Sequence, residues 1–124
     1  MSDRQKQRRV SNIKAILLDA ADVIRRRGLA KGSFATPDGV CFFGAILIAL
    51  GTDDVAMKRI VIPAKQLNKA ETVAHHVACW MKLASSGMSA TASMVKWNDA
   101  AERTVEDVAS AMEGTALNLS EDEL

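Results

Sequence analysis

Three kinds of side chain in this sequence could carry out nucleophilic chemistry together: a thiol, an imidazole, and a carboxylate or amide. Cys41 comes first in the chain, His75 and His76 follow, and Asn98 and Asp99 come last. In a cysteine nucleophile, the imidazole takes the proton of the thiol and the third group orients the ring. A thiol in the first turn of a helix also feels the helix dipole, which favours the thiolate. The sequence therefore contains the ingredients of a cysteine enzyme.

The residues around Cys41 favour packing over catalysis. Val40 and Phe42 flank the thiol within an apolar run, and burial among apolar side chains raises the pKa of a thiol. A small buried cysteine that only packs is the ordinary case in folded proteins. We therefore predict no catalytic residues, and we keep a cysteine-nucleophile enzyme that uses Cys41 as a second alternative.

A zinc site is a further hypothesis. His75 and Cys79 are four residues apart, so on a helix they share one face, and with His76 and Cys41 they could form a Cys2His2 set. Adjacent histidines cannot easily turn toward one metal from the same helix, and the sequence has no CxxC pair. We predict no metal site and no cofactor, with His76 facing the core or a partner and His75 exposed to solvent.

Charge is divided between the two ends of the chain, although the net charge is only +1. Residues 1–31 carry nine Lys or Arg against three Asp, whereas residues 97–124 carry eight acidic residues against Arg103 alone. Such a split is typical of a basic arm for nucleic acid, of an acidic tail that competes for it, or of attraction within a chain or homo-oligomer. Two solvated helix faces are the simplest explanation. The candidate binding residues are Arg8, Arg9, Arg25, Arg26 and Arg27.

Composition places the chain among soluble one-domain proteins. It has 124 residues, of which 48% are hydrophobic and 25% charged, with two prolines. The longest apolar run, Val40 to Leu50, is too short to span a bilayer, and the basic N-terminus has no apolar segment behind it. Two cysteines without a secretion signal are expected to stay reduced. We therefore expect a cytoplasmic protein that does not bind membranes.

Helical periodicity organises most of the chain. Ser11 to Arg27 has apolar residues every three or four positions, and Gly28 is a typical helix stop. Gly39 to Gly51 is apolar on all sides, which fits a buried central helix or a buried strand, and its small residues favour the helix, in which Gly44 lets a neighbouring backbone come close. Lys65 to Ala84 again has an apolar face and predicts another helix.

The other segments are shorter. Thr52 to Lys58 predicts a short helix and Arg59 to Pro63 a strand or extended link, while Met88 to Lys96 fits a helix, a loop or a short strand. A final helix is predicted from Thr104 to about Gly114. The expected fold class is all-α: a compact single domain of about five helices, with one short extended segment near 59–63. Its expected parts are a basic N-terminal arm (1–10), a helical domain (11–114) and an acidic C-terminal tail (115–124).

The stretch WNDAAERT contains two helix-starting signals. Asp99 and Thr104 are each followed three positions later by an acidic residue, which is the pattern of a capping box. We predict a short turn that leads into the last helix, with Trp97 anchoring the turn in the core. Asp99 and Arg103 have a spacing that permits an ion pair if this segment is helical.

Two segments resemble a known family. GLAKGSFATPDGVCFFGAI (28–46) and WNDAAERTVEDV (97–108) are similar to a domain of unknown function in small proteins of actinobacteria and their phages. The resemblance covers about Ala20 to Met112. It implies a shared architecture and a source in an actinobacterium or its phage, and no chemistry, because the family has no assigned activity. The matching positions are Gly39, Cys41, Gly44, Ala45, Trp97, Asn98, Asp99, Arg103 and Thr104.

These observations favour a binding protein over an enzyme. We expect a small non-catalytic cytoplasmic protein that binds a host macromolecule, in the first instance a host protein. The first alternative is a nucleic-acid-binding protein that uses the basic N-terminal helix, whose binding would weaken steeply with salt. A homo-oligomer is compatible with both.

Overall fold

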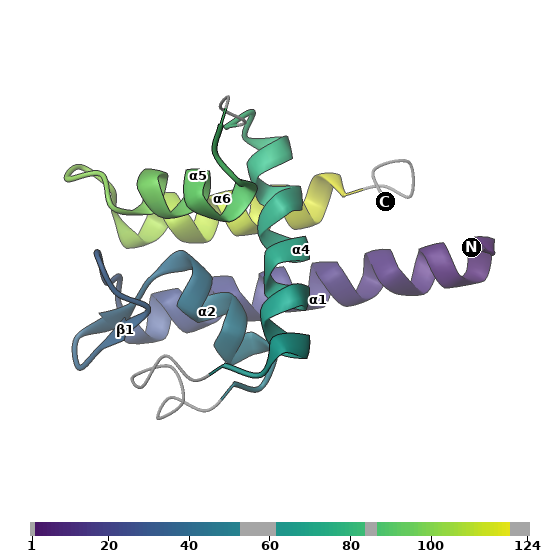
Figure 1. Cartoon of the computed structure of the whole chain (residues 1–124), viewed down its shortest axis with the longest axis horizontal. Coiled ribbons are helices and arrows are strands. Elements are labelled where there is room, and N and C mark those ends of the chain that lie inside the picture. The colour runs from purple at the N-terminus through teal and green to yellow at the C-terminus, as the bar shows by residue number, and fades with distance from the viewer. Residues whose placement is uncertain (1, 53–61, 84–86, 120–124) are drawn as a thin grey trace.

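The computed structural model describes residues 2–52, 62–83 and 87–119 (Figure 1). Within these ranges the chain forms five helices and one two-stranded antiparallel sheet, which confirms the predicted all-α class. The helix expected over Thr52 to Lys58 and the extended link expected over Arg59 to Pro63 fall almost entirely outside the described residues. The elements are α1 (Asp3–Arg27), β1 (Ala35–Thr36), β2 (Gly39–Val40), α2 (Phe42–Ala49), α4 (Ala64–Trp80), α5 (Ala90–Asn98) and α6 (Val105–Asn118).

Helix α1 is longer than the sequence pattern indicated. It begins at Asp3 rather than at Ser11, because Ser2 and Gln5 form a capping box in which each side chain accepts a hydrogen bond from the other residue's backbone N–H. The segment expected to be an N-terminal arm is therefore helical from Asp3 onward. Gly28 ends the helix with φ 89°, a conformation that glycine adopts without strain.

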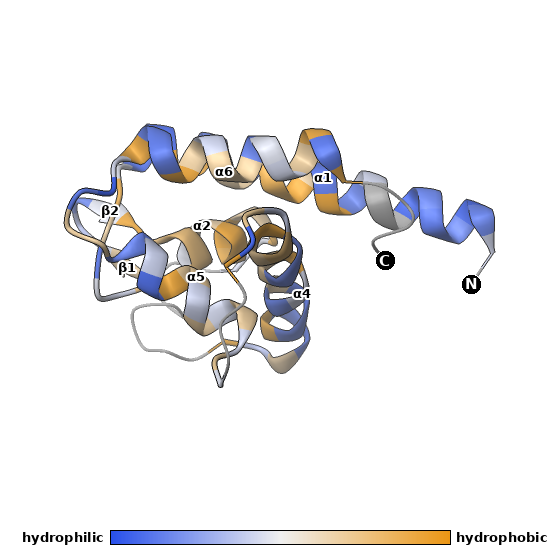
Figure 2. Cartoon of the chain, turned by 90° about the horizontal axis from the view of Figure 1, so that it is seen from above, coloured by the Kyte–Doolittle hydropathy of each residue, from blue (hydrophilic) through white to orange (hydrophobic). Residues whose placement is uncertain are grey.

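Figure 1 shows α6 lying along α1 in the opposite direction, with α4 crossing this pair and the N-terminal turns of α1 extending past the other elements. Apolar surfaces of the helices turn toward one another, while the N-terminal end of α1 is hydrophilic (Figure 2). Helix α2 supplies the centre of the core: Phe42, Phe43, Ile46 and Leu47 are all almost completely buried. No helix of the described residues combines the length and apolar character needed to cross a membrane.

The segment before α2 is extended, where a helix from Gly39 was predicted. Val40 pairs with Ala35 in the small sheet, and its backbone also exchanges hydrogen bonds with Gly28 and Ala30 at 3.0 and 2.9 Å. These bonds hold the chain extended until Cys41 caps α2. The prediction for Gly44 is confirmed, because its Cα faces the Phe34 carbonyl oxygen so closely that a side chain there would collide with it.

The later helices differ from the prediction mainly at their ends. Helix α4 ends at Trp80 rather than Ala84, since Lys82 takes a left-handed conformation with φ 57°. The ambiguous segment near Met88 forms α5, capped by Ser89. Helix α6 starts with the predicted capping box at Thr104 but continues to Asn118. The helix-starting signal at Asp99 begins no helix, because that residue caps the end of α5, and the predicted short turn into α6 follows it.

Candidate functional site

Asn98 joins three separate segments of the fold. Its side chain is 1% exposed, and its Oδ1 accepts a hydrogen bond from the Phe42 backbone N–H at 2.9 Å. Its Nδ2 donates to the Ala30 carbonyl oxygen and to Asp99 Oδ1, both at 3.0 Å. The C-terminal end of α5 is thereby tied to the start of α2 and to the loop after α1. Because the amide oxygen and nitrogen are both used in this way, Asn98 has a structural role.

Cys41 is the N-cap of α2 and is buried, with 4% exposed. Its Sγ accepts a hydrogen bond from the Gly44 backbone N–H at 3.3 Å. Burial raises the pKa of the Cys41 thiol, and this effect outweighs the backbone hydrogen bonds, which act in the opposite direction. The helix start that was expected to activate this thiol is therefore present, but the surroundings favour the protonated form.

The predicted cysteine triad is only partly assembled. Cys41 and Asp99 both line a cavity of about 120 Å³, whereas His75 and His76 line a different cavity of about 280 Å³ on α4. Among the described residues, no hydrogen bond joins Cys41 to either histidine. The structure thus brings the thiol close to the proposed orienting carboxylate and leaves the proposed base elsewhere.

The histidines have opposite environments, as the sequence predicted: His76 is 6% exposed and His75 is exposed. His75 Nε2 lies 3.5 Å from Cys79 Sγ, one turn along α4. Within the described part of the chain, no three His, Cys, Asp or Glu side chains are grouped so that they could hold a metal ion. The four-residue set that the sequence suggested is therefore not formed in one chain.

The arginine cluster at the end of α1 is largely paired. Arg25 donates four hydrogen bonds to Glu106 and Glu113 of α6, at 2.7 to 3.1 Å. These bonds raise the pKa of Arg25 and lower the pKa of both carboxyl groups. Arg26 pairs with Asp22 at 2.8 Å. Of the predicted binding residues, these two are already occupied with carboxylates of the same chain.

The other predicted binding residues differ from one another. Arg8 is exposed on the N-terminal part of α1, whereas Arg27 at its end is half-buried. The side chain of Arg9 lies outside the described part of the chain. The basic surface available to a partner is therefore the N-terminal part of α1 rather than its end.

The Trp97 segment forms a turn between α5 and α6. The Arg103 guanidinium lies 4.2 Å from the centre of the Trp97 ring and donates to the Trp97 carbonyl oxygen at 3.0 Å. Asp99 instead accepts from the Gly32 backbone N–H at 3.1 Å, so the predicted Asp99–Arg103 ion pair is not formed. Lys31 donates to two carbonyl oxygens of the same turn. Together these contacts fix the turn against the loop that follows α1.

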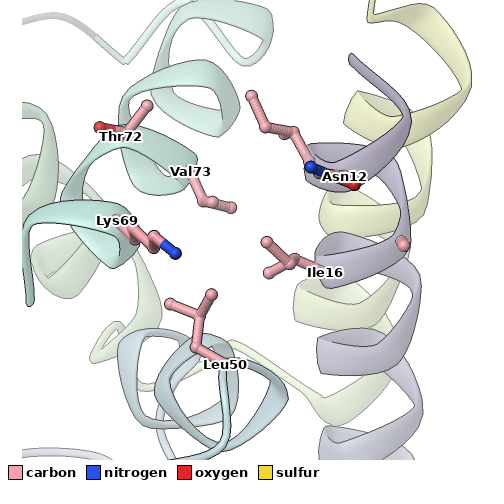
Figure 3. A pocket seen from close by; sticks show the side chains of 8 residues that line it. Asn12, Ile16, Leu50, Lys69, Thr72 and Val73 are labelled. Carbon is pink, nitrogen blue, oxygen red and sulfur yellow. The ribbon is translucent and has the colours of Figure 1, made fainter. Parts of the chain in front are cut away.

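A cavity of about 550 Å³ lies between α1, α4 and the end of α2 (Figure 3). We call this cavity the α1–α4 groove. Apolar side chains dominate the space between the helices, and Figure 3 shows the Lys69 side chain reaching into it. The sequence did not reveal this groove, because its apolar members have the spacing of core residues. It is lined by Asn12, Ile13, Ala15, Ile16, Leu50, Lys69, Thr72 and Val73.

A comparison with protein families identifies the family of this chain as one of unknown function. The model of a family of unknown function, DUF6197, matches residues 8–118. The chain belongs to this family. The DUF6197 match runs from α1 to the last residue of α6, and so extends past both ends of the span Ala20 to Met112. It contains the Asn98 contacts, the Trp97 turn and the α1–α4 groove. No curated protein and no solved structure matches the chain.

Proposed function

We propose that this protein is a small non-catalytic interaction protein that binds another protein through the α1–α4 groove. The observation that carries the proposal is the groove itself, which is lined by Ile13, Ile16, Leu50 and Val73. Ile16 and Leu50 are only half-buried, so the groove leaves some apolar surface open, and such surface favours a site of interaction. The groove is formed by α1, α4 and the end of α2, which are packed helices. A groove between helices is suited to receive a side chain or a helix from a partner.

The charge around the groove favours an acidic partner. Lys69 lines the groove, and the exposed residues Arg4 and Arg8 and the half-buried Lys6 lie on the same helix as Ile13 and Ile16. An amphipathic segment with apolar residues on one side and carboxylates on the other would complement both features. We therefore propose an apolar and acidic segment of a protein as the occupant.

The residues once considered for catalysis support a non-catalytic role. The buried Cys41 thiol has a raised pKa and caps a helix, and the Asn98 amide is fully used in holding backbone groups. A nucleophile needs a thiolate and a base within hydrogen-bond distance, and His75 lines a separate cavity. The positions of Cys41 and Asn98 are thus explained by their structural roles, and no catalytic role is needed to account for them.

The sequence resemblance to proteins of actinobacteria and their phages is the basis for the proposed source and partner of this protein. We infer a source in an actinobacterium or its phage, a location in the cytoplasm and a host protein as partner. Nucleic acid is the alternative partner, and the exposed basic residues on the N-terminal part of α1 favour it. The pairing of Arg25 and Arg26 with carboxylates reduces the surface left for phosphates.

The test is a pull-down from actinobacterial lysate with the purified full chain, washed at low and then at high salt. The variant Ala15→Arg fills the groove from an exposed helical position, and Ala92→Arg places the same side chain on the exposed face of α5. We expect a protein that is retained at high salt by the wild type and by Ala92→Arg, and that is lost with Ala15→Arg. Equal retention by both variants would remove the groove from the proposal, and capture of nucleic acid that is released by salt would favour the alternative.

A further inference from the structure

His75 and Cys79 form an exposed pair on α4, away from the α1–α4 groove. Both side chains are exposed to solvent, and they point to the same side of the helix because they are one turn apart. The Cys79 Sγ and the His75 Nε2 are 3.5 Å apart. A thiol and an imidazole are the two side chains that zinc selects in structural sites.

The distance between these hydrogen-bonded atoms is also compatible with two ligands of a tetrahedral zinc ion. With a Zn–S bond of about 2.3 Å, a Zn–N bond of about 2.05 Å and an angle of about 109° between them, the two ligand atoms are about 3.6 Å apart. The observed 3.5 Å matches this value with both side chains in their present positions. The pair, which in one chain is joined by a hydrogen bond, is thus also spaced as two adjacent ligands of one ion would be.

One chain supplies only two of the four ligands. No group of three metal-binding side chains exists among the residues that the structure describes, and His76, the nearest other imidazole, is 94% buried. Structural zinc sites are almost always four-coordinate, so another source must provide the remaining two. A twofold axis through the ion would present the same pair from a second copy of the chain.

We propose that His75 and Cys79 of two copies of this chain together hold one Zn²⁺ ion in a Cys2His2 site that joins the copies across α4. Each thiol loses its proton to solvent when it binds, so two protons leave for each ion, and the two thiolates neutralise its charge. No oxidation or reduction is involved.

The surface beside the pair fits such an interface. Trp80 follows Cys79 directly and is 41% exposed, so its ring offers apolar surface next to the pair. Its ring packs on one side against Gly114 of α6. The pair, Trp80 and His76 line a cavity of about 280 Å³ that a second copy can cover. Metal binding and burial of Trp80 would then reinforce each other.

The test is light scattering on the full chain after size exclusion, with a phosphine reductant present to exclude disulfides. With Zn²⁺ we expect twice the mass of one chain and one ion for two chains, and with a chelator we expect the mass of one chain. Cobalt is a second probe, because Co²⁺ held by two thiolates and two imidazoles gives an intense thiolate charge-transfer band. The variants His75→Ala and Cys79→Ser should remain monomeric, whereas Lys65→Ala, on an exposed position of the same helix, should dimerise as the wild type does.

Three results would overturn the proposal. The first is a mass of one chain at saturating Zn²⁺, or one ion for each chain. The second is a dimer that survives the chelator. The third is a zinc-dependent dimer that persists in both His75→Ala and Cys79→Ser. Circular dichroism of each variant would show that its helices are intact, and the cobalt spectrum of the wild type tests the ligand set without any variant.

Discussion

The side-chain oxygen of Asn98 accepts a hydrogen bond from the backbone N–H of Phe42 at 2.9 Å, across 56 positions of the sequence. Phe42 is the first residue of α2, whose N-terminal N–H groups have no partners within the helix. A residue from α5 therefore supplies part of the cap of α2, and Cys41 supplies another part through its Sγ. The start of the central helix is thus held by a contact that no local sequence pattern contains.

Removing the Asn98 amide should destabilise the fold strongly. The variant Asn98→Ala leaves the Phe42 N–H and the Ala30 carbonyl oxygen buried without this partner. Each unsatisfied buried group costs about 1–3 kcal/mol, so we expect a loss of roughly 2–5 kcal/mol in the free energy of unfolding, measured by urea denaturation. Asn118→Ala, which removes an exposed hydrogen bond at the end of α6, is the matched control and should change little. A loss below about 1 kcal/mol for Asn98→Ala would contradict the structural role of this residue.

The two glycines inside helices should respond differently to alanine. Gly44→Ala places a methyl group against the Phe34 backbone oxygen, which cannot move without the loop, so we expect a loss of about 2 kcal/mol or more despite the higher helix propensity of alanine. Gly114→Ala meets the end of the Trp80 side chain, which is partly exposed and can shift. Thermal and urea unfolding of both variants would check this order. Equal stability of Gly44→Ala and the wild type would show that the close approach is not required.

Local signals in the sequence predicted much of the fold. Gly28 ends α1 and Thr104 begins α6 as expected, because each signal depends on residues within one turn. The start of α1 was missed because residues 3–10 are polar on nearly all sides, so the apolar stripe begins only later. The extended segment at Val40 was missed because it depends on backbone hydrogen bonds with Gly28 and Ala30, ten or more positions earlier, in addition to the short hairpin with Ala35.

The candidate sites were harder to predict for the same reason. Ile13, Ile16 and Val73 have the spacing of core residues, and only the packing of three elements decides which of them face a groove. The shared helical face of His75 and Cys79 did follow from their spacing. The choice of Cys41 as their companion ligand was wrong, because Cys41 caps α2 and lines another cavity.

The Arg25 contacts predict a specific response to acid. Hydrogen bonds from Arg25 lower the pKa of Glu106 and Glu113 relative to the unfolded chain. Carboxyl groups of this kind stabilise the fold above the unfolded pKa of glutamate, about 4.3, and the contribution is lost as the pH falls through their folded pKa. In Arg25→Ala, both pKa values should rise toward the ordinary value, as measured by NMR titration of the carboxyl carbons. Arg26→Ala, which removes the pair with Asp22, should leave both titrations unchanged, and a shift of equal size in that variant would rule out the specific contact.

The two cysteines should differ sharply in their reaction with an alkylating agent. Cys79 is exposed, whereas Cys41 is buried and has a raised pKa, so both access and thiolate content are low at Cys41. We expect iodoacetamide at neutral pH to modify Cys79 in the folded protein, and to modify Cys41 only after urea is added, with the sites identified by mass spectrometry. Bound Zn²⁺ should protect Cys79 if the proposed site forms, and a chelator should restore its reaction. Rapid modification of Cys41 in the folded protein would contradict the burial argument and return the cysteine-enzyme hypothesis to consideration, because only an accessible thiolate reacts in this way.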